Sequence, residues 1–514
     1  MNGAKSLVET LLKSGVDTCF ANPGTSEMHF VAALDQSPGM RCVLGLQENV
    51  VTGMADGYYR VSGKVACTLL HCGPGLANGM ANLHNAYRAR SGVVNIVGDQ
   101  ATYHRQYDAP LTAKTVAMAE TVSQWVRSSS DSHKLGGDAA HAVAAALTTP
   151  GQIATLIVPS DTSWNEGGEV AAAVPVPQPP HVASAAIDAA ARALEDNGGK
   201  TLILLSGKGA LREGQALAAR IASATGAHIM LDYTAPRVQR GEGALALERV
   251  PYATDRAVEV LGAYENIILV NANPPVAFFA YPDKPSIQYR PDAALLVLTQ
   301  PDQNALEGLS RLADALDAPP VKLPSHGERA QVASGSPSPE KLAQTIAAVI
   351  PEHTIISDES VSYGRGFYAF SNAAPAHEWL HLVGGAIGDG LPIATGAAIG
   401  AGGEQRVVSI QADGAGMYSL QALWTQARER LPVTTIVISN RKYNILINEY
   451  KNVGAVPGET AMNMLSLADP DLDWVALANG LGVEAARAHD METLADLMMA
   501  SFRERKPFLI ELIV

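Results

Sequence analysis

Two polar residues that could hold a metal ion follow strand-like apolar segments in the last quarter of the chain. Asp413 follows the segment at residues 406–411 within an Ala-Asp-Gly-Ala-Gly turn, and Asn440 follows the segment at residues 433–439. Asn440 lies 27 residues after Asp413, which is room for one β-α-β crossover, so both residues are expected at neighbouring strand ends. A glycine-rich turn that enters a helix presents backbone N–H groups to phosphate. The oxygen ligands beside it predict Mg²⁺ next to a phosphorylated ligand.

Three residues of the first hundred could take part in chemistry at other strand ends. Thr25 follows an Asn-Pro-Gly turn, Glu48 follows the apolar segment at residues 42–46, and His71 ends the segment at residues 65–71. Each also has a purely structural interpretation: a helix N-cap for Thr25, a carboxylate stabilised by a helix N-terminus for Glu48, and a packed ring for His71. Because histidine titrates near neutral pH, His71 is a candidate general acid or base.

The elements that must position these residues alternate between helix and strand along most of the chain, which predicts an α/β fold of doubly wound parallel sheets. Ligands bind such sheets at the carboxyl ends of the strands. Two Pro- and Gly-rich segments, residues 166–182 and 319–339, are typical of linkers. They predict three domains at residues 1–165, 183–318 and 340–514, each in the ordinary size range of a domain.

Composition excludes several classes of function. The chain has 514 residues and a net charge of −14, which argues against nucleic acid and anionic membranes as partners. The apolar runs are strand-length, and the first residues form an amphipathic pattern without a signal-peptide core, so neither a membrane span nor a signal peptide is expected. The four cysteines show no Cys-x-x-Cys spacing and are expected to be reduced, buried thiols of a cytoplasmic protein.

Five motifs occur in an order that resembles a known family. They are Asn-Pro-Gly-Thr from residue 22, Leu-Gln-Glu ending at Glu48, Leu-His-Cys-Gly-Pro-Gly from residue 70, Gly-Ala-Ile-Gly-Asp-Gly-Leu-Pro from residue 385, and the Asp413 to Asn440 pattern. Together they resemble the thiamin-diphosphate (ThDP) dependent 2-keto acid enzymes, in particular benzoylformate decarboxylase and the acetolactate synthase large-subunit group. Ala412 stands where that family usually has the first glycine of a Gly-Asp-Gly motif.

The resemblance implies pyrimidine-binding, central and diphosphate-binding domains, and active sites at a dimer interface within a homotetramer. Glu48 would activate the cofactor through its aminopyrimidine ring, and Glu48 of one subunit would face Asp413 of the other. Mg²⁺ would be held by the side chains of Asp413 and Asn440 and by the carbonyl group of Lys442. The remaining cofactor contacts implied by the resemblance are Asn22, Pro23, Ile387, Gly414, Ala415 and Tyr418.

The resemblance also implies a substrate pocket. Thr25 matches a hydroxyl that binds the substrate carboxylate, and His71 matches an active-site histidine of the decarboxylase. Other pocket positions are Pro110, Leu111, His381, Ile445 and Leu446. The decarboxylase has a second histidine in its central domain, whereas residues 275–281 here read Pro-Val-Ala-Phe-Phe-Ala-Tyr. FAD is not expected, because the chain is short for a flavin-carrying synthase and its middle third shows no flavin segment.

The expected function is ThDP- and Mg²⁺-dependent decarboxylation of a 2-keto acid through an acyl-anion intermediate, which gives an aldehyde or a 2-hydroxyketone. One alternative is an acetolactate-synthase-type carboligase that uses pyruvate. A second is a non-catalytic binding protein of the same fold, which the retention of Glu48, Asp413 and Asn440 disfavours. A third is an NAD-binding oxidoreductase suggested by Gly207-x-Gly209, a pattern more often found in a packing turn than in a dinucleotide site.

Overall fold

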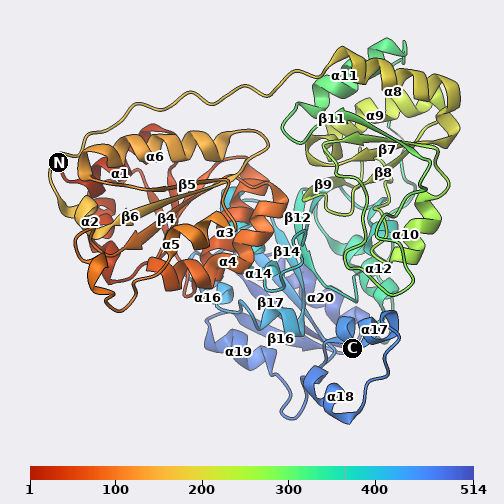
Figure 1. Cartoon of the computed structure of the whole chain (residues 1–514). Helices are drawn as coiled ribbons and strands as arrows, with labels where there is room; N and C mark the ends of the chain where they lie inside the picture. Colours follow the sequence, from red (N-terminus) through yellow and green to blue (C-terminus); the bar gives the residue numbers. More distant parts are fainter. Residues whose placement is uncertain (324, 365) are drawn as a thin grey trace.

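The computed structural model describes residues 1–323, 325–364 and 366–514. It contains three β-sheets with helices on both faces, and Figure 1 shows them as three lobes. An extended segment without helix or strand leads from the first lobe to the second, and it covers the linker predicted at residues 166–182. The second predicted linker, residues 319–339, includes Pro324, which lies outside the described residues.

The first sheet has six parallel strands in the order β2-β1-β3-β4-β6-β5. Its strands are β1 (Thr18–Asn22), β2 (Arg41–Leu44), β3 (Ala66–Leu70), β4 (Val93–Asp99), β5 (Trp125–Ser128) and β6 (Ile153–Pro159). The helical elements around it are α1 (Gly3–Lys13), η1 (Thr25–Glu27), α2 (Met28–Asp35), α3 (Glu48–Ser62), α4 (Cys72–Ala89), η2 (Arg105–Tyr107), α5 (Thr115–Glu120), α6 (Ser132–Leu147) and α7 (Ser160–Trp164).

The second sheet has four parallel strands in the order β11-β10-β7-β8. They are β7 (Thr201–Leu205), β8 (His228–Leu231), β10 (Asn266–Val270) and β11 (Ala294–Thr299). Its helical elements are α8 (Ser184–Asn197), η3 (Gly198–Lys200), η4 (Gly207–Ala210), α9 (Arg212–Thr225), α10 (Thr254–Leu261) and α11 (Ala305–Ala315). The Gly207-x-Gly209 pattern lies in η4, where Gly209 approaches Val270 closely, so this turn packs against the neighbouring strand β10.

The third sheet has seven strands in the order β16-β17-β15-β14-β12-β13-β9. They are β9 (Arg237–Arg240), β12 (Thr354–Glu359), β13 (His377–His381), β14 (Val407–Ala412), β15 (Val433–Ser439), β16 (Glu484–Ala488) and β17 (Phe508–Ile513). Its helices are α12 (Pro339–Val349), α13 (Phe367–Ser371), α14 (Gly390–Gly400), α15 (Asp413–Gly416), α16 (Ala422–Arg428), α17 (Asn444–Asn452), α18 (Glu459–Leu465), α19 (Trp474–Gly480) and α20 (Met491–Ser501). β9, which comes from the middle third of the chain, pairs antiparallel with β13 and is the one exception to the parallel pattern among the described strands.

The first and third sheets are joined by close packing of α3 against α14. A Cβ atom at Gly57 would lie 2.2 Å from the carbonyl oxygen of Ile393, and one at Gly396 would lie 1.9 Å from that of Met54. Only glycine allows the two backbones to approach so closely. Buried side chains of both sheets belong to one hydrophobic cluster, so the two sheets share a continuous core.

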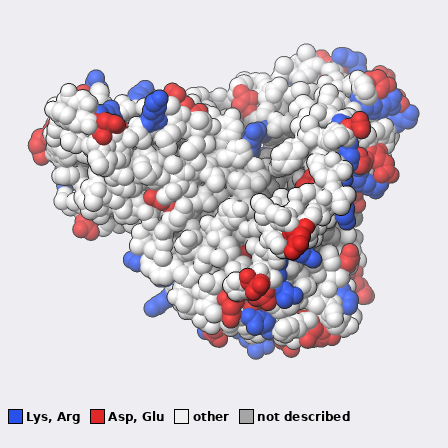
Figure 2. Space-filling model, turned by 60° about the horizontal axis from the view of Figure 1, so that its bottom comes forward, with Lys and Arg blue, Asp and Glu red and all other residues white. Residues whose placement is uncertain are grey.

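On the face drawn in Figure 2, charged side chains gather along the margins and leave a broad uncharged area between them, without a continuous basic stripe. Within the described chain, no helix combines the length and the apolar character needed to cross a bilayer.

Contrary to the expectation of four buried thiols, Cys42 is exposed, because it lies on the edge strand β2.

Candidate active site

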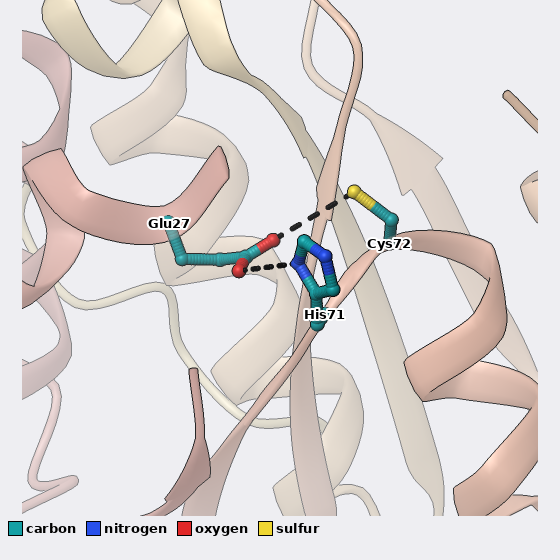
Figure 3. A group of neighbouring side chains, drawn as sticks. All are labelled: Glu27, His71 and Cys72. Atoms are coloured by element: carbon teal, nitrogen blue, oxygen red, sulfur yellow. Dashed lines mark hydrogen bonds and ion pairs between the residues drawn. The ribbon is translucent and has the colours of Figure 1, made fainter. Parts of the chain in front are cut away.

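His71 lies at the junction between β3 and α4, where it is the N-cap residue of the helix. Its Nδ1 is 2.9 Å from Oε2 of Glu27, and the same oxygen accepts the backbone N–H of Gly24 at 2.8 Å. The Glu27 side chain is 2% exposed and that of His71 is 22% exposed. Figure 3 shows the two side chains pointing toward each other from different elements. A buried carboxylate thus anchors an imidazole that solvent can reach, which suits a proton-transfer group.

Glu48 is the first residue of α3, and its side chain is buried. Its Oε2 accepts a hydrogen bond from Nδ2 of Asn78 in α4 at 3.0 Å. A Cβ atom at Gly75 would lie 2.9 Å from Oε1 of Glu48 and 3.3 Å from Cβ of His71. Gly75 therefore allows the carboxylate and the histidine to lie on either side of one residue, so the structure does bring these two predicted residues together.

Cys72 completes the group drawn in Figure 3. Its Sγ is 2.9 Å from Oγ of Ser26 and 3.9 Å from Oε1 of Glu27. Burial raises the pKa of this thiol to about 11, so it is protonated at neutral pH. Ligand atoms of Glu27, His71 and Cys72 lie within 4.8 Å of one another, a donor set that transition metals accept. Because the Glu27 oxygens already accept bonds from the turn and from His71, we interpret this group as a support for the histidine.

The Asn-Pro-Gly-Thr turn lies against this group. A Cβ atom at Gly24 would lie 2.1 Å from Nδ1 of His71, so the turn requires glycine there. Asn22 donates from Nδ2 to the carbonyl oxygen of Gly45 at 2.8 Å, which ties the turn to the segment that precedes α3. Pro23 and Thr25 are exposed, with Thr25 as the first residue of η1. The turn therefore places Gly24 against the His71 ring and leaves Thr25, the next residue, exposed.

Asp413 begins α15 directly after β14. The parallel register pairs Ala412 with Ile438, which places Asp413 beside the end of β15, where Asn440 follows. Its Oδ1 accepts the N–H of Gly414 at 2.8 Å and its Oδ2 accepts that of Arg441 at 2.6 Å. Burial raises the pKa of Asp413 while these backbone donors oppose the rise.

Asn440 and Lys442 supply further oxygen atoms next to Asp413. Oδ1 of Asn440 accepts the N–H of Lys442 at 3.0 Å, and the carbonyl of Lys442 accepts the N–H of Asn444 at 2.9 Å. A carboxylate, an amide oxygen and a backbone carbonyl are the ligand types that Mg²⁺ prefers. A Cβ atom at Gly414 would lie 2.5 Å from the Tyr443 ring, so the turn has no room for a side chain. This donor set and this bare turn fit a magnesium diphosphate group.

The turn that contains Ile387 is shaped by a buried carboxylate that sequence reasoning did not identify. Glu359 accepts the N–H groups of the three residues that follow Ile387, at 2.8, 3.1 and 2.9 Å. Its position at the end of β12 is the signal that could have revealed it, since strand ends supplied the other candidates. Asn85 in α4 also donates to the carbonyl oxygen of Ala386 at 2.8 Å. Ile387 is half-buried, and Tyr418 is exposed and lies against Gly388.

The predicted pocket residues are distributed over several elements. His381 ends β13 and is buried, with its ring stacked on Tyr368; burial lowers its pKa well below the usual value. Ile445 and Leu446 lie in the first turn of α17, and Leu446 is 45% exposed. Pro110 and Leu111 lie in an exposed loop after η2. The accessible positions of Ile445 and Leu446 suit side chains that line a pocket. His381, in contrast, is enclosed by aromatic rings.

The candidate residues form two groups rather than one within a chain. Thr25, Glu48 and His71 lie at the first sheet, and Asp413 and Asn440 lie at the third. Helix α4 links the groups, because its asparagines bond both Glu48 and the turn before α14. In the part of the chain that the structure describes, Glu48 and Asp413 share no hydrogen-bond partner.

Comparison with known proteins agrees with this arrangement. Residues 1–124 match the N-terminal TPP binding domain of thiamine pyrophosphate enzymes, and residues 363–512 match the C-terminal TPP binding domain. A relative from Mycobacterium tuberculosis, named after the acetolactate synthase large subunits (IlvX), is 44% identical over 100% of this chain and 99% of its own. Benzoylformate decarboxylase from Pseudomonas aeruginosa is 28% identical over 98% of this chain and 97% of its own.

The fold agrees as well. The structure of the ThDP-dependent 4-hydroxybenzoylformate decarboxylase of Rhodococcus jostii RHA1 superposes with a TM-score of 0.86 at 22% identity, covering 99% of this chain and 98% of the other. The chain therefore belongs to the thiamine pyrophosphate enzyme family. The comparisons confirm the predicted family and the α/β fold class. They also confirm the prediction of an enzyme with ThDP-dependent 2-keto acid chemistry.

Proposed function

We propose that the chain is a ThDP- and Mg²⁺-dependent decarboxylase that converts a 2-keto acid into CO₂ and an aldehyde. The observation that carries this proposal is the His71–Glu27 pair beside Glu48, with Nδ1 of His71 2.9 Å from Oε2 of Glu27. Release of an aldehyde requires a proton donor next to the reacting carbon, and a partly exposed, anchored imidazole can serve as that donor.

Cofactor and metal would be held mainly by the third sheet. The side chains of Asp413 and Asn440 and the carbonyl of Lys442 would bind Mg²⁺, consistent with their all-oxygen donor set. When bound, ThDP supplies the electron sink that loss of CO₂ requires. The remaining contacts would come from Gly414, Ala415, Tyr418, Ile387, Asn22 and Pro23.

The protein's own groups would divide the remaining work. The Glu48 carboxylate would bind the aminopyrimidine and hold it in the reactive tautomer, and burial of Glu48 keeps water from competing for that bond. The Thr25 hydroxyl would orient the carboxylate of the substrate, and His71 would give and take protons at the former keto carbon and oxygen. Pro110, Leu111, His381, Ile445 and Leu446 would shape the pocket.

The assembly we propose is a cytoplasmic homotetramer built from dimers with shared active sites. In the described chain, Glu48 and Asp413 are held by different sheets and have no common partner, so a second copy would bring them together. The three sheets would then correspond to pyrimidine-binding (1–165), central (183–318) and diphosphate-binding (340–514) domains, apart from β9, which joins the third sheet from the central range. A small 2-keto acid is the substrate.

A second function is favoured by one observation. The relative at 44% identity carries the acetolactate synthase name, so an acetolactate-synthase-type carboligase that joins two pyruvate molecules is the alternative.

The test is a product analysis with enzyme that is stripped of cofactor and reconstituted with ThDP and Mg²⁺. CO₂ release and products are followed with pyruvate, a branched 2-keto acid and benzoylformate. An aldehyde as the main product supports the proposal, whereas acetolactate or another 2-hydroxyketone establishes the carboligase. If no CO₂ appears with any acid, the proposed decarboxylase is wrong.

A further inference from the structure

A group of aromatic side chains from the middle third of the chain remains exposed near the candidate active site. The Phe278 ring contacts the rings of Tyr252 and Phe279, with centroid distances of 5.5 and 4.9 Å. Tyr233 lies at its edge, with a centroid distance of 6.5 Å. Phe278 is 40% exposed and Phe279 is 57% exposed. A contiguous exposed apolar surface of this kind marks a place where a ligand or partner binds.

We call the rings of Tyr233, Tyr252, Phe278 and Phe279 the aromatic wall. One end of it reaches the turn that contains Gly385 and Ile387. A Cβ atom at Gly385 would lie 2.5 Å from Cζ of Phe278, so the ring rests directly on the backbone of this residue. Gly385 has a φ of +82° and precedes Ile387 by two residues. The Phe278 ring therefore borders the turn that belongs to the proposed cofactor site.

The other end of the wall reaches Glu449 in α17. The hydroxyl of Tyr281 donates to Oε2 of Glu449 at 2.9 Å, and the hydroxyl of Tyr252 donates to Oε1 at 3.5 Å. Glu449 follows Ile445 by four residues in the same helix, so both side chains lie on one face of α17. Ile445 belongs to the proposed pocket, and Glu449 lies one helical turn farther from the metal site.

The charge of Glu449 is not balanced by a basic side chain. Lys284 lies over the Tyr281 ring but pairs with Asp255, at 2.7 Å, and no ion pair of Glu449 occurs among the described residues. Burial and the charge of Glu449 raise the pKa of Tyr252, so this phenol keeps its proton and donates it. Each phenol occupies one lone pair of a carboxylate oxygen, which leaves further acceptor sites free.

We infer that Glu449, framed by Tyr252, Tyr281 and Phe278, is a binding subsite for the end of the substrate that is remote from the keto group. The substrate class is a 2-keto acid with a positively charged distal group, such as an ammonium or guanidinium. The carboxylate forms a charge-assisted hydrogen bond with that group, and the aromatic faces stabilise its charge. This inference rests on the proposed 2-keto acid reaction and adds the recognition of the distal group to it.

The experiment compares two aromatic 2-keto acids of nearly equal shape, 4-(aminomethyl)benzoylformate and 4-ethylbenzoylformate, with pyruvate as a third substrate. The wild-type holoenzyme is expected to show a kcat/KM at least about tenfold higher for the ammonium compound than for the ethyl compound, the scale of a hydrogen bond between charged groups. Glu449→Gln is expected to abolish this preference through a higher KM for the ammonium compound. Its kcat/KM for the ethyl compound, measured on the same preparation, shows that the variant is folded and active.

Two further variants sharpen the result. Tyr281→Phe removes one donor to Glu449 and is expected to reduce the preference without abolishing it. Glu459→Gln removes an exposed carboxylate in α18 and is expected to leave the preference intact. Turnover of all three acids without a charge preference, or an unchanged preference in Glu449→Gln, would overturn the subsite alone. Absence of turnover with every acid would instead overturn the proposed function and the subsite together.

Discussion

The first and third sheets hold the carboxylates of the candidate site in different ways. At the first sheet, Glu48 accepts from the Asn78 side chain, and Glu27 pairs with the His71 side chain in addition to accepting the N–H of Gly24. At the third sheet, Asp413 binds backbone N–H groups of its own turn and of the next strand end. Of these partners, the imidazole of His71 is a group that can gain and lose a proton, whereas the Asn78 amide and the backbone N–H groups only hold a carboxylate in place. The difference is consistent with the proposed roles, which are proton transfer at the first sheet and ion binding at the third.

The histidines show the same contrast. His71 at the first sheet is partly exposed and paired with a carboxylate. His377 and His381 in β13 of the third sheet are buried, and burial lowers the pKa of His377 to about 4 and that of His381 well below its usual value. A histidine buried without an acidic partner remains neutral, so it is not a candidate for proton transfer. The following substitutions test this division, from the largest expected effect to the smallest.

Replacement of Glu48 by Gln is the strongest test of the role proposed for the first sheet, which is proton transfer. We expect kcat to fall by about 10³-fold, within the range that general acid–base catalysis contributes. The affinity for ThDP and Mg²⁺ should change little, because the Asp413 turn is untouched. Steady-state kinetics and cofactor titration of the same preparation separate the two effects, with Glu459→Gln as an exposed-carboxylate control. Intact kcat combined with lost cofactor binding would reverse the assignment.

Replacement of Asp413 by Asn tests the ion-binding side. The amide oxygen can still accept one of the two backbone N–H groups, but the amide nitrogen cannot accept the other and the negative charge is gone, so Mg²⁺ affinity should fall by at least about tenfold. Excess Mg²⁺ should restore activity, which it should not do for Glu48→Gln. Asp471→Asn is the matched control, since Asp471 is a nearby exposed carboxylate paired with Arg441. Equal Mg²⁺ titration curves for the Asp413 variant and the wild type would contradict a metal-binding role.

Replacement of Glu27 by Gln tests whether the carboxylate acts through His71. We expect kcat to fall by about tenfold or more because the imidazole loses its charged anchor, while KM and ThDP affinity change little. The split between kcat and KM distinguishes this from general damage to the turn. Glu9→Gln is the control, because Glu9 is a part-buried carboxylate that accepts from Ser37 in the same lobe. A parallel loss of ThDP affinity would show that Glu27 only shapes the turn.

Much of the arrangement at these strand ends could be predicted, because the relevant signals are local. The strand at Val433–Ser439 matches the predicted range, and Asp413 and Asn440 follow neighbouring parallel strands as expected. Helix α4 begins at Cys72, and Pro74 lies in its first turn. Proline is tolerated there, since the first backbone N–H groups of a helix have no partner within it.

The features that could not be predicted depend on contacts between distant segments. β9 joins the third sheet from the middle third of the chain, with Arg240 opposite His377, and nothing local in its sequence specifies that partner. The pairing of Glu27 with His71 joins residues 44 positions apart, and that of Tyr281 with Glu449 joins residues 168 apart. A turn glutamate and a helix glutamate are ordinary in sequence, and only the fold shows which groups they contact.

Replacement of His377 by Asn tests the neutral histidine of the third sheet and should have the smallest effect. Its pKa of about 4 lies below the ordinary value of about 6.5, so below pH 6.5 the unfolded chain binds a proton that the folded chain does not. Stability is therefore lost as pH falls, by about 2 kcal/mol between pH 7 and 5. Asn can keep the bond to the Pro375 carbonyl but does not titrate, so its melting temperature should fall less over this range. Thermal melts at both pH values, with the exposed His141→Asn as control, measure the difference; an equal fall in the wild type and the His377 variant would show that His377 titrates normally in the folded state.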